Sequence, residues 1–142
     1  MDRRIKRFLK AHKVMTLGVV LDGGSWSAPL FYAFDEERGR LIFTSSSSSA
    51  HICGALANPC VSVGIVGRSG SVARLRGAQI VGVLKDCSQL SAEYAECRKI
   101  FLRRFPFAAR RLDDLWYVEI ASIKYTDNRL GFGTKLFYNS KV

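Results

Sequence analysis

A run of five serines, Ser45 to Ser49, contains the side chains best placed to do chemistry in this sequence. An apolar strand pattern at 41–43 leads into it, and a helical pattern with Ile52 and Leu56 four residues apart follows it. Serine is a good N-cap and a poor residue for a helix interior, so we predict that this helix begins near Ser48 or Ser49. The free N–H groups and the positive dipole end of such a helix suit an anion, above all a phosphate. A flexible serine loop without a ligand is the alternative.

The sequence offers no catalytic constellation beside this segment. His51 is predicted to lie in the first turn of the short helix, in a structural or ligand-facing role, and no Ser-His-Asp or Cys-His order follows from sequence separation. The glycines of Gly131-Phe132-Gly133 neither follow a strand nor open a helix, so they are not predicted to form a dinucleotide-binding loop. Catalytic residues are therefore left unassigned.

The net charge of +10 comes largely from two basic clusters, in residues 3–13 and 98–111. Such a balance attracts polyanions and also suits a protein that binds phosphorylated small molecules, and charge alone does not separate the two. No apolar run approaches the roughly 18 to 20 residues that a membrane span needs. The basic N-terminus lacks the hydrophobic region of a secretory signal, so we expect a cytoplasmic protein.

The four cysteines, Cys53, Cys60, Cys87 and Cys97, contain no C-x-x-C spacing and have apolar or helical neighbours. We predict that they are buried, reduced thiols. Together with His12 and His51 they form no zinc constellation, and no metal site is predicted.

Hydrophobic periodicity predicts one domain over residues 1–142 with an α+β fold. Pro29 lacks an N–H and should lie in an edge strand or at a bulge, Gly77 suggests a bulge, and Asp22-Gly23-Gly24 marks a hairpin. The tail at 124–138 is polar and punctuated by glycine. The predicted strands cover 14–21, 26–34, 41–44, 61–65, 72–84 and 116–123, and the predicted helices cover 3–12, about 48–58 and 91–105. The result is a six-stranded, mostly antiparallel β-barrel with flanking helices.

Four segments carry a family resemblance: LIFTSSSSSAHICGALANP, ARLRGAQIVG, RKIFLRRFP and KYTDNRLGFG. In composition and order they resemble the split β-barrel superfamily of pyridoxamine-phosphate-oxidase-like, flavin-binding proteins, and within it the YhbP-like branch. The resemblance extends from about Val14 to Tyr138. It implies a homodimer that binds FMN in two grooves at the subunit interface and uses the flavin as an oxidoreductase. Because members of the family usually bind FMN, the resemblance favours FMN over a deazaflavin or haem.

The resemblance also implies which residues hold the flavin. The phosphate side would consist of Thr44, Ser45, Ser46, Ser48, Ser49 and His51. The ring side would consist of Ala28, Pro29, Leu30 and Phe43, with Trp116 coming from the partner subunit.

The sequence departs from the family pattern at Ser48 and Ala50, where relatives carry lysine and arginine. Each charge-assisted contact to a phosphate contributes about 1.5 to 3 kcal/mol, so this loss would weaken flavin binding unless a cation such as Arg74 or Arg76 compensates. One alternative is a flavin-free split barrel with another ligand or a structural role. A basic nucleic-acid-binding module is a second alternative, but its cations lie on predicted helices without the stacking aromatics of a known motif.

Overall fold

The computed structural model describes residues 1–140, and the last two residues of the predicted domain lie outside that range. Within it the chain forms eight strands, three α-helices and three short 3-10 turns. In chain order they are α1 (Arg3–Ala11), β1 (Val14–Leu21), β2 (Gly24–Phe31), β3 (Ala33–Asp35), β4 (Arg40–Thr44), α2 (Ala50–Ala57), β5 (Cys60–Val66), η1 (Val72–Arg74), β6 (Arg76–Asp86), α3 (Tyr94–Arg104), η2 (Pro106–Arg110), β7 (Leu115–Asp127), η3 (Asn128–Leu130) and β8 (Lys135–Asn139).

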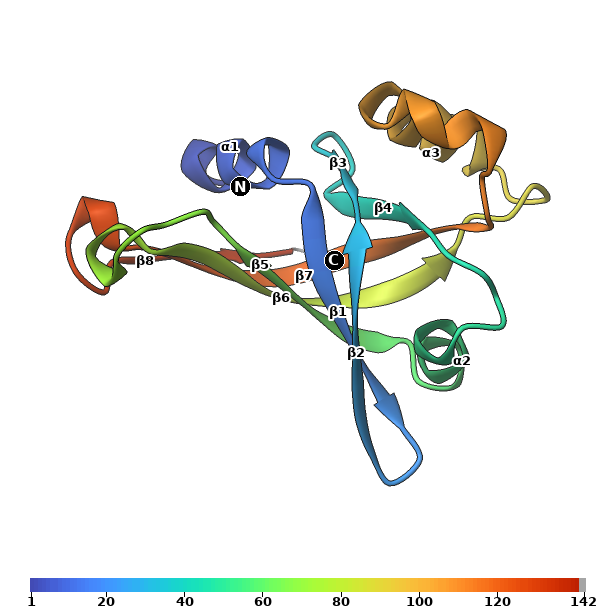
Figure 1. Ribbon diagram of the computed structural model, residues 1–142, viewed down its shortest axis with the longest axis horizontal. Helices are drawn as coiled ribbons and strands as arrows, with labels where there is room; N and C mark the ends of the chain where they lie inside the picture. The colour runs from blue at the N-terminus through green and yellow to red at the C-terminus, as the bar shows by residue number, and fades with distance from the viewer. Residues whose placement is uncertain (141–142) are drawn as a thin grey trace.

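All strands belong to one curled antiparallel sheet with the order β2-β1-β5-β6-β7-β4-β3. The long strand β7 pairs with β6 along one edge, and its other edge is shared by β4 in its first half and β8 in its second. Figure 1 shows α1 and α3 on one side of this sheet, flanking β3 and β4, with α2 beside the far end of β5. No helix of residues 1–140 is long and apolar enough to cross a membrane.

The core lies on the inner face of the curled sheet, and strand β5 shows how the sequence places it there. Its residues alternate between buried and exposed, so that Val61, Val63 and Ile65 point inward. Helix α1 covers one end of this core with Ile5, Phe8 and Leu9. A second, smaller apolar cluster lies beneath α3.

The prediction of six strands was wrong by two. The predicted strand at 26–34 is divided at Tyr32 into β2, which pairs with β1, and β3, which pairs with β4. The second additional strand, β8, comes from the tail. The predicted strand at 72–84 begins only at Arg76, after the turn η1. The antiparallel α+β architecture is as predicted.

Of three local predictions, two are confirmed and one is wrong. Ser49 is the N-cap residue of α2, and Pro29 lies in β2, which ends the strand order, so both predictions are confirmed. The bulge, however, lies between Val81 and Gly82 rather than at Gly77. A Cβ atom on Gly82 would come within 2.5 Å of Val118 Cγ1 and 2.6 Å of the Glu119 carbonyl oxygen, so the close approach of β7 requires glycine there.

Candidate functional site

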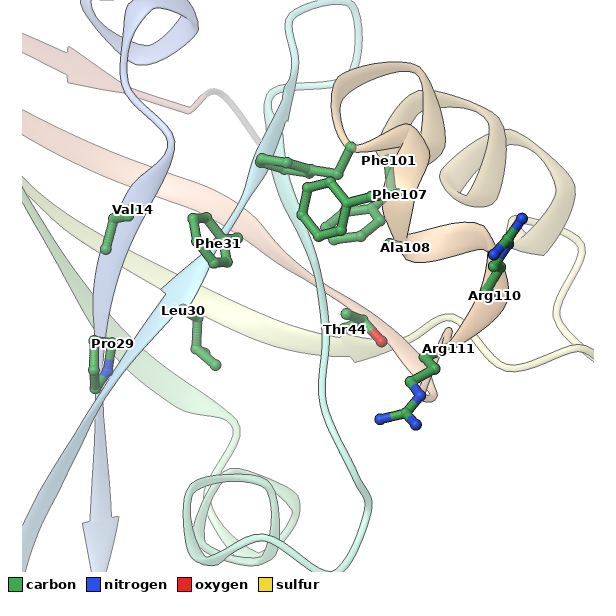
Figure 2. Close-up of a pocket in the computed structure, with 11 residues that line it drawn as sticks. Val14, Pro29, Leu30, Phe31, Thr44, Phe101, Phe107, Ala108, Arg110 and Arg111 are labelled. Carbon is green, nitrogen blue, oxygen red and sulfur yellow. The ribbon is translucent and has the colours of Figure 1, made fainter.

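A cavity of about 710 Å³ opens between strand β2, the end of β4 and the segment formed by α3 and η2. Figure 2 shows Pro29, Leu30 and Phe31 on one side and the side chains of α3 and η2 on the other. Its volume is in the range of small-molecule and cofactor sites. The cavity is lined by Val14, Pro29, Leu30, Phe31, Thr44, Phe101, Phe105, Phe107, Ala108, Arg110 and Arg111.

Four phenylalanines make the apolar wall of the cavity. Phe101 on α3 and Phe105, the C-cap residue of α3, are four residues apart, with ring centroids separated by 5.0 Å. Phe105 also lies 5.5 Å from Phe31 and 6.1 Å from Phe107. Pro106 ends α3 and starts η2, which carries Phe107 to the cavity mouth. Phe31 and Phe107 remain largely exposed, so the wall offers aromatic surface to a ligand.

The other end of the cavity is basic. Arg110 is the last residue of η2 and Arg111 follows it, and neither forms a salt bridge within the described chain. In Figure 2 the Arg111 side chain and the Thr44 hydroxyl lie at the same end of the cavity. The Thr44 hydroxyl donates to the Asp114 carbonyl oxygen at 3.1 Å, which ties the end of β4 to the segment after Arg111. The cavity thus has an aromatic wall and a cationic end.

The serine segment folds back on itself beside this end. The Ser46 and Ser48 hydroxyls lie 2.8 Å apart, and the Ser49 hydroxyl donates to the Ser46 carbonyl oxygen at 2.7 Å. Ser49 therefore makes no side-chain cap bond to helix α2. The Ser45 hydroxyl lies 2.7 Å from Nε2 of His51. The segment is a compact turn, which argues against the flexible loop.

His51 is partly buried against the serine segment, and burial lowers its pKa below the ordinary value of 6.5. The neutral imidazole is therefore the form that dominates at pH 7. A lowered pKa means that protonation opposes folding, so this contribution to stability is present above the unfolded-state pKa and is lost as the pH falls. His51 thus supports the turn without adding a cation beside it.

The structure brings only some of the predicted site residues to the cavity. Pro29, Leu30 and Thr44 line it. Ala28 and Phe43 are buried, so they offer no open surface to a ring. None of the predicted residues after Thr44 lines the cavity. Ser45 is buried, Ser46 and Ser48 are exposed, and Ser49 and His51 are partly buried.

Trp116 is buried within the chain, at the base of the serine segment. Its side chain is buried, and its indole Nε1 donates to the Ser45 carbonyl oxygen at 2.9 Å. The Ser45 N–H in turn donates to the Asp114 carbonyl oxygen at 3.0 Å. Trp116 therefore positions the junction between Thr44 and the serine segment and has little surface left for a ligand.

The cations that line the cavity are Arg110 and Arg111, whereas the sequence analysis offered Arg74 or Arg76 as the compensating cation. Arg76 lines a different cavity with η3 and β8, at the far end of the sheet, and its guanidinium lies over the Phe8 ring. Arg110 and Arg111 were part of the predicted basic cluster but were not assigned to the site. Their position after Phe105-Pro106-Phe107, where a helix stops and turns, was the signal that a site assignment could have used.

The sheet and this cavity define a class, the split-barrel α+β proteins. The structure resembles that of a heme-binding protein from Mycobacterium smegmatis with a TM-score of 0.74 at 19% identity, covering 89% of this chain and 52% of that one. It also resembles a FAD-binding protein from Mesorhizobium loti with a TM-score of 0.70 at 19% identity, covering 84% of this chain and 87% of that one. At these identities the likeness establishes the fold.

The sequence relatives name the family. The chain is 35% identical over 136 residues to the UPF0306 protein YhbP of Salmonella paratyphi A, which covers 94% of this chain and 90% of the relative. It belongs to the UPF0306 (YhbP) family, as the resemblance to the YhbP-like branch predicted. No family model matches the chain.

Proposed function

We propose that this protein binds FMN in the cavity between β2, the end of β4 and α3–η2. The observation that carries the proposal is the union of an aromatic wall with two arginines, Arg110 and Arg111, in the lining of one cavity. FMN has the matching form, because a flat apolar ring system is joined to a phosphate. Its ring would lie along Pro29 and Leu30, and its phosphate near Thr44.

The lining residues favour flavin over haem. Haem iron needs an axial ligand, which proteins supply from histidine, cysteine, methionine or tyrosine. None of these four residue types is among the residues that line this cavity. The structural neighbours described as heme-binding and FAD-binding make both cofactors worth testing.

Arg110 and Arg111 would replace the two cations that Ser48 and Ala50 do not provide. They come from the turn after α3 instead of the loop before α2, yet both segments meet at Thr44. A guanidinium gives a phosphate two parallel hydrogen bonds, which suits it to this role. When bound, the flavin would supply the electron chemistry of an oxidoreductase, and the protein would supply its position and surroundings.

Replacing both arginines with glutamine is expected to weaken FMN binding about 10- to 100-fold, the equivalent of one charge-assisted contact of about 1.5 to 3 kcal/mol. Calorimetry with FMN measures the effect. The variant Arg98→Gln/Lys99→Gln removes the same charge from exposed positions of α3 and should bind like the wild type. Ser46→Ala/Ser48→Ala tests the serine segment separately, because an unchanged affinity would exclude those hydroxyls from the phosphate site.

The first experiment is the visible spectrum of the purified protein, repeated after addition of FMN and desalting. A retained flavin band is the expected result. A Soret band would replace the flavin in this proposal with haem. A colourless protein that releases all added FMN would contradict it and favour the flavin-free split barrel.

We also propose that the protein is a homodimer, joined through the outer face of β5, β6 and β8. Large apolar side chains gather on this face, and two shallow cavities that share Gly64 and Gln79 run across it. Contiguous exposed apolar surface of this kind marks protein–protein contacts, and a second copy of the chain presents the same surface. The exposed apolar residues of this face are Val66, Val72, Leu75, Val81, Phe132 and Phe137.

Val81→Arg is expected to convert the dimer to a monomer, because a two-fold axis would bring two like charges into an apolar contact. Light scattering should give about twice the chain mass of 15.8 kDa for the wild type and the single mass for the variant. Val20→Arg is the matched control, since Val20 on β1 is 51% exposed against 48% for Val81. A wild-type monomer, or a dimer unaffected by Val81→Arg, would contradict this interface.

A further inference from the structure

Two cysteines far from any predicted role lie together beneath α3. Cys87 follows the end of β6, and its N–H donates to the Leu115 carbonyl oxygen at 3.1 Å. Cys97 lies in the first turns of α3. Both are 0% exposed and belong to the same apolar cluster, and the Cys87 thiol donates a hydrogen bond to the Cys97 sulfur. The prediction of buried thiols holds for this pair and was wrong for Cys53 and Cys60, which are exposed.

A buried guanidinium with a spare nitrogen accompanies the pair. Arg40 is 2% exposed, its Nε donates to Asp35 at 2.8 Å, and its Nη1 donates to Glu93 at 2.9 Å. Its Nη2 is buried and has no hydrogen-bond partner among the described residues. A buried donor without a partner costs free energy, so an acceptor near Arg40 Nη2 would stabilise the protein.

The charge of Arg40 acts on the Cys97 sulfur. The hydrogen bond from Cys87 lowers the pKa of Cys97, and the charge of Arg40 lowers it further, although burial opposes both. The same hydrogen bond, together with burial, raises the pKa of Cys87. Burial opposes the charged form of Arg40, but its bonds to Glu93 and Asp35 and the nearby Cys97 raise its pKa overall. The pair therefore combines one activated thiol with one that keeps its proton.

We propose that Cys87 and Cys97 form a redox dithiol that a hydroperoxide oxidises to an intramolecular disulfide. The Cys97 thiolate attacks the distal peroxide oxygen, the O–O bond breaks, and the leaving oxygen takes up a proton and departs as water or an alcohol. The Cys87 sulfur then attacks the resulting Cys97 sulfenic acid and loses its proton, and the sulfenic hydroxyl leaves as water. Two thiols and one hydroperoxide give one disulfide, one water and one further water or alcohol.

The position of the pair gives its oxidation a structural consequence. The disulfide would tie the end of β6 to helix α3, closing the loop that carries the fully exposed Leu90. Phe101 on α3 and its C-cap residue Phe105 belong to the cluster around the thiols and also line the main cavity. The redox state of the pair would thus act on the element that forms the aromatic wall, whatever ligand that wall binds.

The test uses the variant Cys53→Ser/Cys60→Ser, which removes only exposed thiols and leaves Cys87 and Cys97 in a folded chain. Hydrogen peroxide is expected to lower the intact mass by two hydrogen atoms, about 2 Da, and to reduce the thiols that can be alkylated after denaturation from two to none. Dithiothreitol should restore both thiols. Peptide mapping should show residues 87 and 97 joined.

Single variants in the same background assign the two roles. Cys87→Ser should leave Cys97 as a sulfenic acid that dimedone captures, whereas Cys97→Ser should give neither the disulfide nor an adduct. An unchanged mass, or oxygen addition without a link between residues 87 and 97, would overturn the proposal. Dimedone capture at Cys87 in the Cys97→Ser variant would overturn the assignment of Cys97 as the nucleophile.

Discussion

Arg40→Met is expected to lower the free energy of unfolding by about 3 to 5 kcal/mol, because it leaves the buried carboxylate of Asp35 without its cation. Arg40 and Asp35 are both buried at the ends of the β3–β4 turn and are joined at 2.8 Å. The guanidinium also lies over the Tyr117 ring, 4.7 Å from its centroid, and holds Glu93 at the start of α3. Its loss would loosen both the hairpin and the helix.

Chemical denaturation at fixed protein concentration measures this effect. Arg38→Met is the matched control, because Arg38 contacts the same Glu93 from a half-exposed position and its loss should cost less than about 1 kcal/mol. Arg40→Met/Asp35→Asn should recover much of the stability, since the double variant buries no charge, and asparagine keeps an acceptor for the Arg38 N–H. An Arg40→Met variant no less stable than Arg38→Met would contradict the argument.

The sequence did not reveal this ion cluster, because the segment that carries Asp35 and Arg40 resembles an ordinary polar turn. The residues from Asp35 to Arg40 have the composition of a charged turn, and the middle of that stretch is exposed. Only its two ends are buried, and they are buried because α3, more than fifty residues later, covers them with Glu93. No local pattern carries information about a helix that arrives from so far along the chain.

The division of β2 from β3 shows the same limit in the sheet. The alternation of side chains continues through Tyr32 without a break, which is why one strand was predicted. The change at Tyr32 is a change of partner: Phe31 pairs with Val14 on β1, whereas Ala33 pairs with Ile42 on β4. Tyr32 marks the junction by donating its hydroxyl to the Leu9 carbonyl oxygen at 2.7 Å. Periodicity reports which side a residue faces and not which strand lies beside it.

The site was predictable to the extent that it depends on local structure. The strand, the serine turn and the N-cap at Ser49 follow from residue types, and the structure confirms them. Which of those side chains face a cavity depends on the return of the chain at α3 and η2, and this return also brings Arg110 and Arg111 to the lining of the cavity. The family resemblance suggested ring contacts from β2 and β4, and of these Pro29 and Leu30 reach the cavity while Phe43 is buried.

Trp116→Ala is expected to lower the free energy of unfolding by about 3 to 5 kcal/mol, the usual cost of removing a buried large aromatic side chain. Trp116 is only 5% exposed and packs in the main core from strand β7. The matched control is Trp26→Ala, because Trp26 is 51% exposed on β2 and its loss should cost much less. Far-UV circular dichroism follows unfolding in both variants, and equal losses would contradict the assignment of Trp116 to the core.

Trp116→Phe separates the packing role of this side chain from its hydrogen bond. Phenylalanine keeps most of the apolar contact but leaves the Ser45 carbonyl oxygen without the indole donor at 2.9 Å, so about 1 to 3 kcal/mol should be lost. Ser45 directly follows Thr44, whose side chain lines the cavity. Loss of the hydrogen bond to the Ser45 carbonyl oxygen should therefore also make the position of Thr44 in the proposed FMN site less fixed. We therefore expect weaker FMN binding by calorimetry at a temperature where the variant is fully folded. A variant that loses stability but binds FMN like the wild type would show that the Trp116–Ser45 bond supports the fold without positioning the ligand.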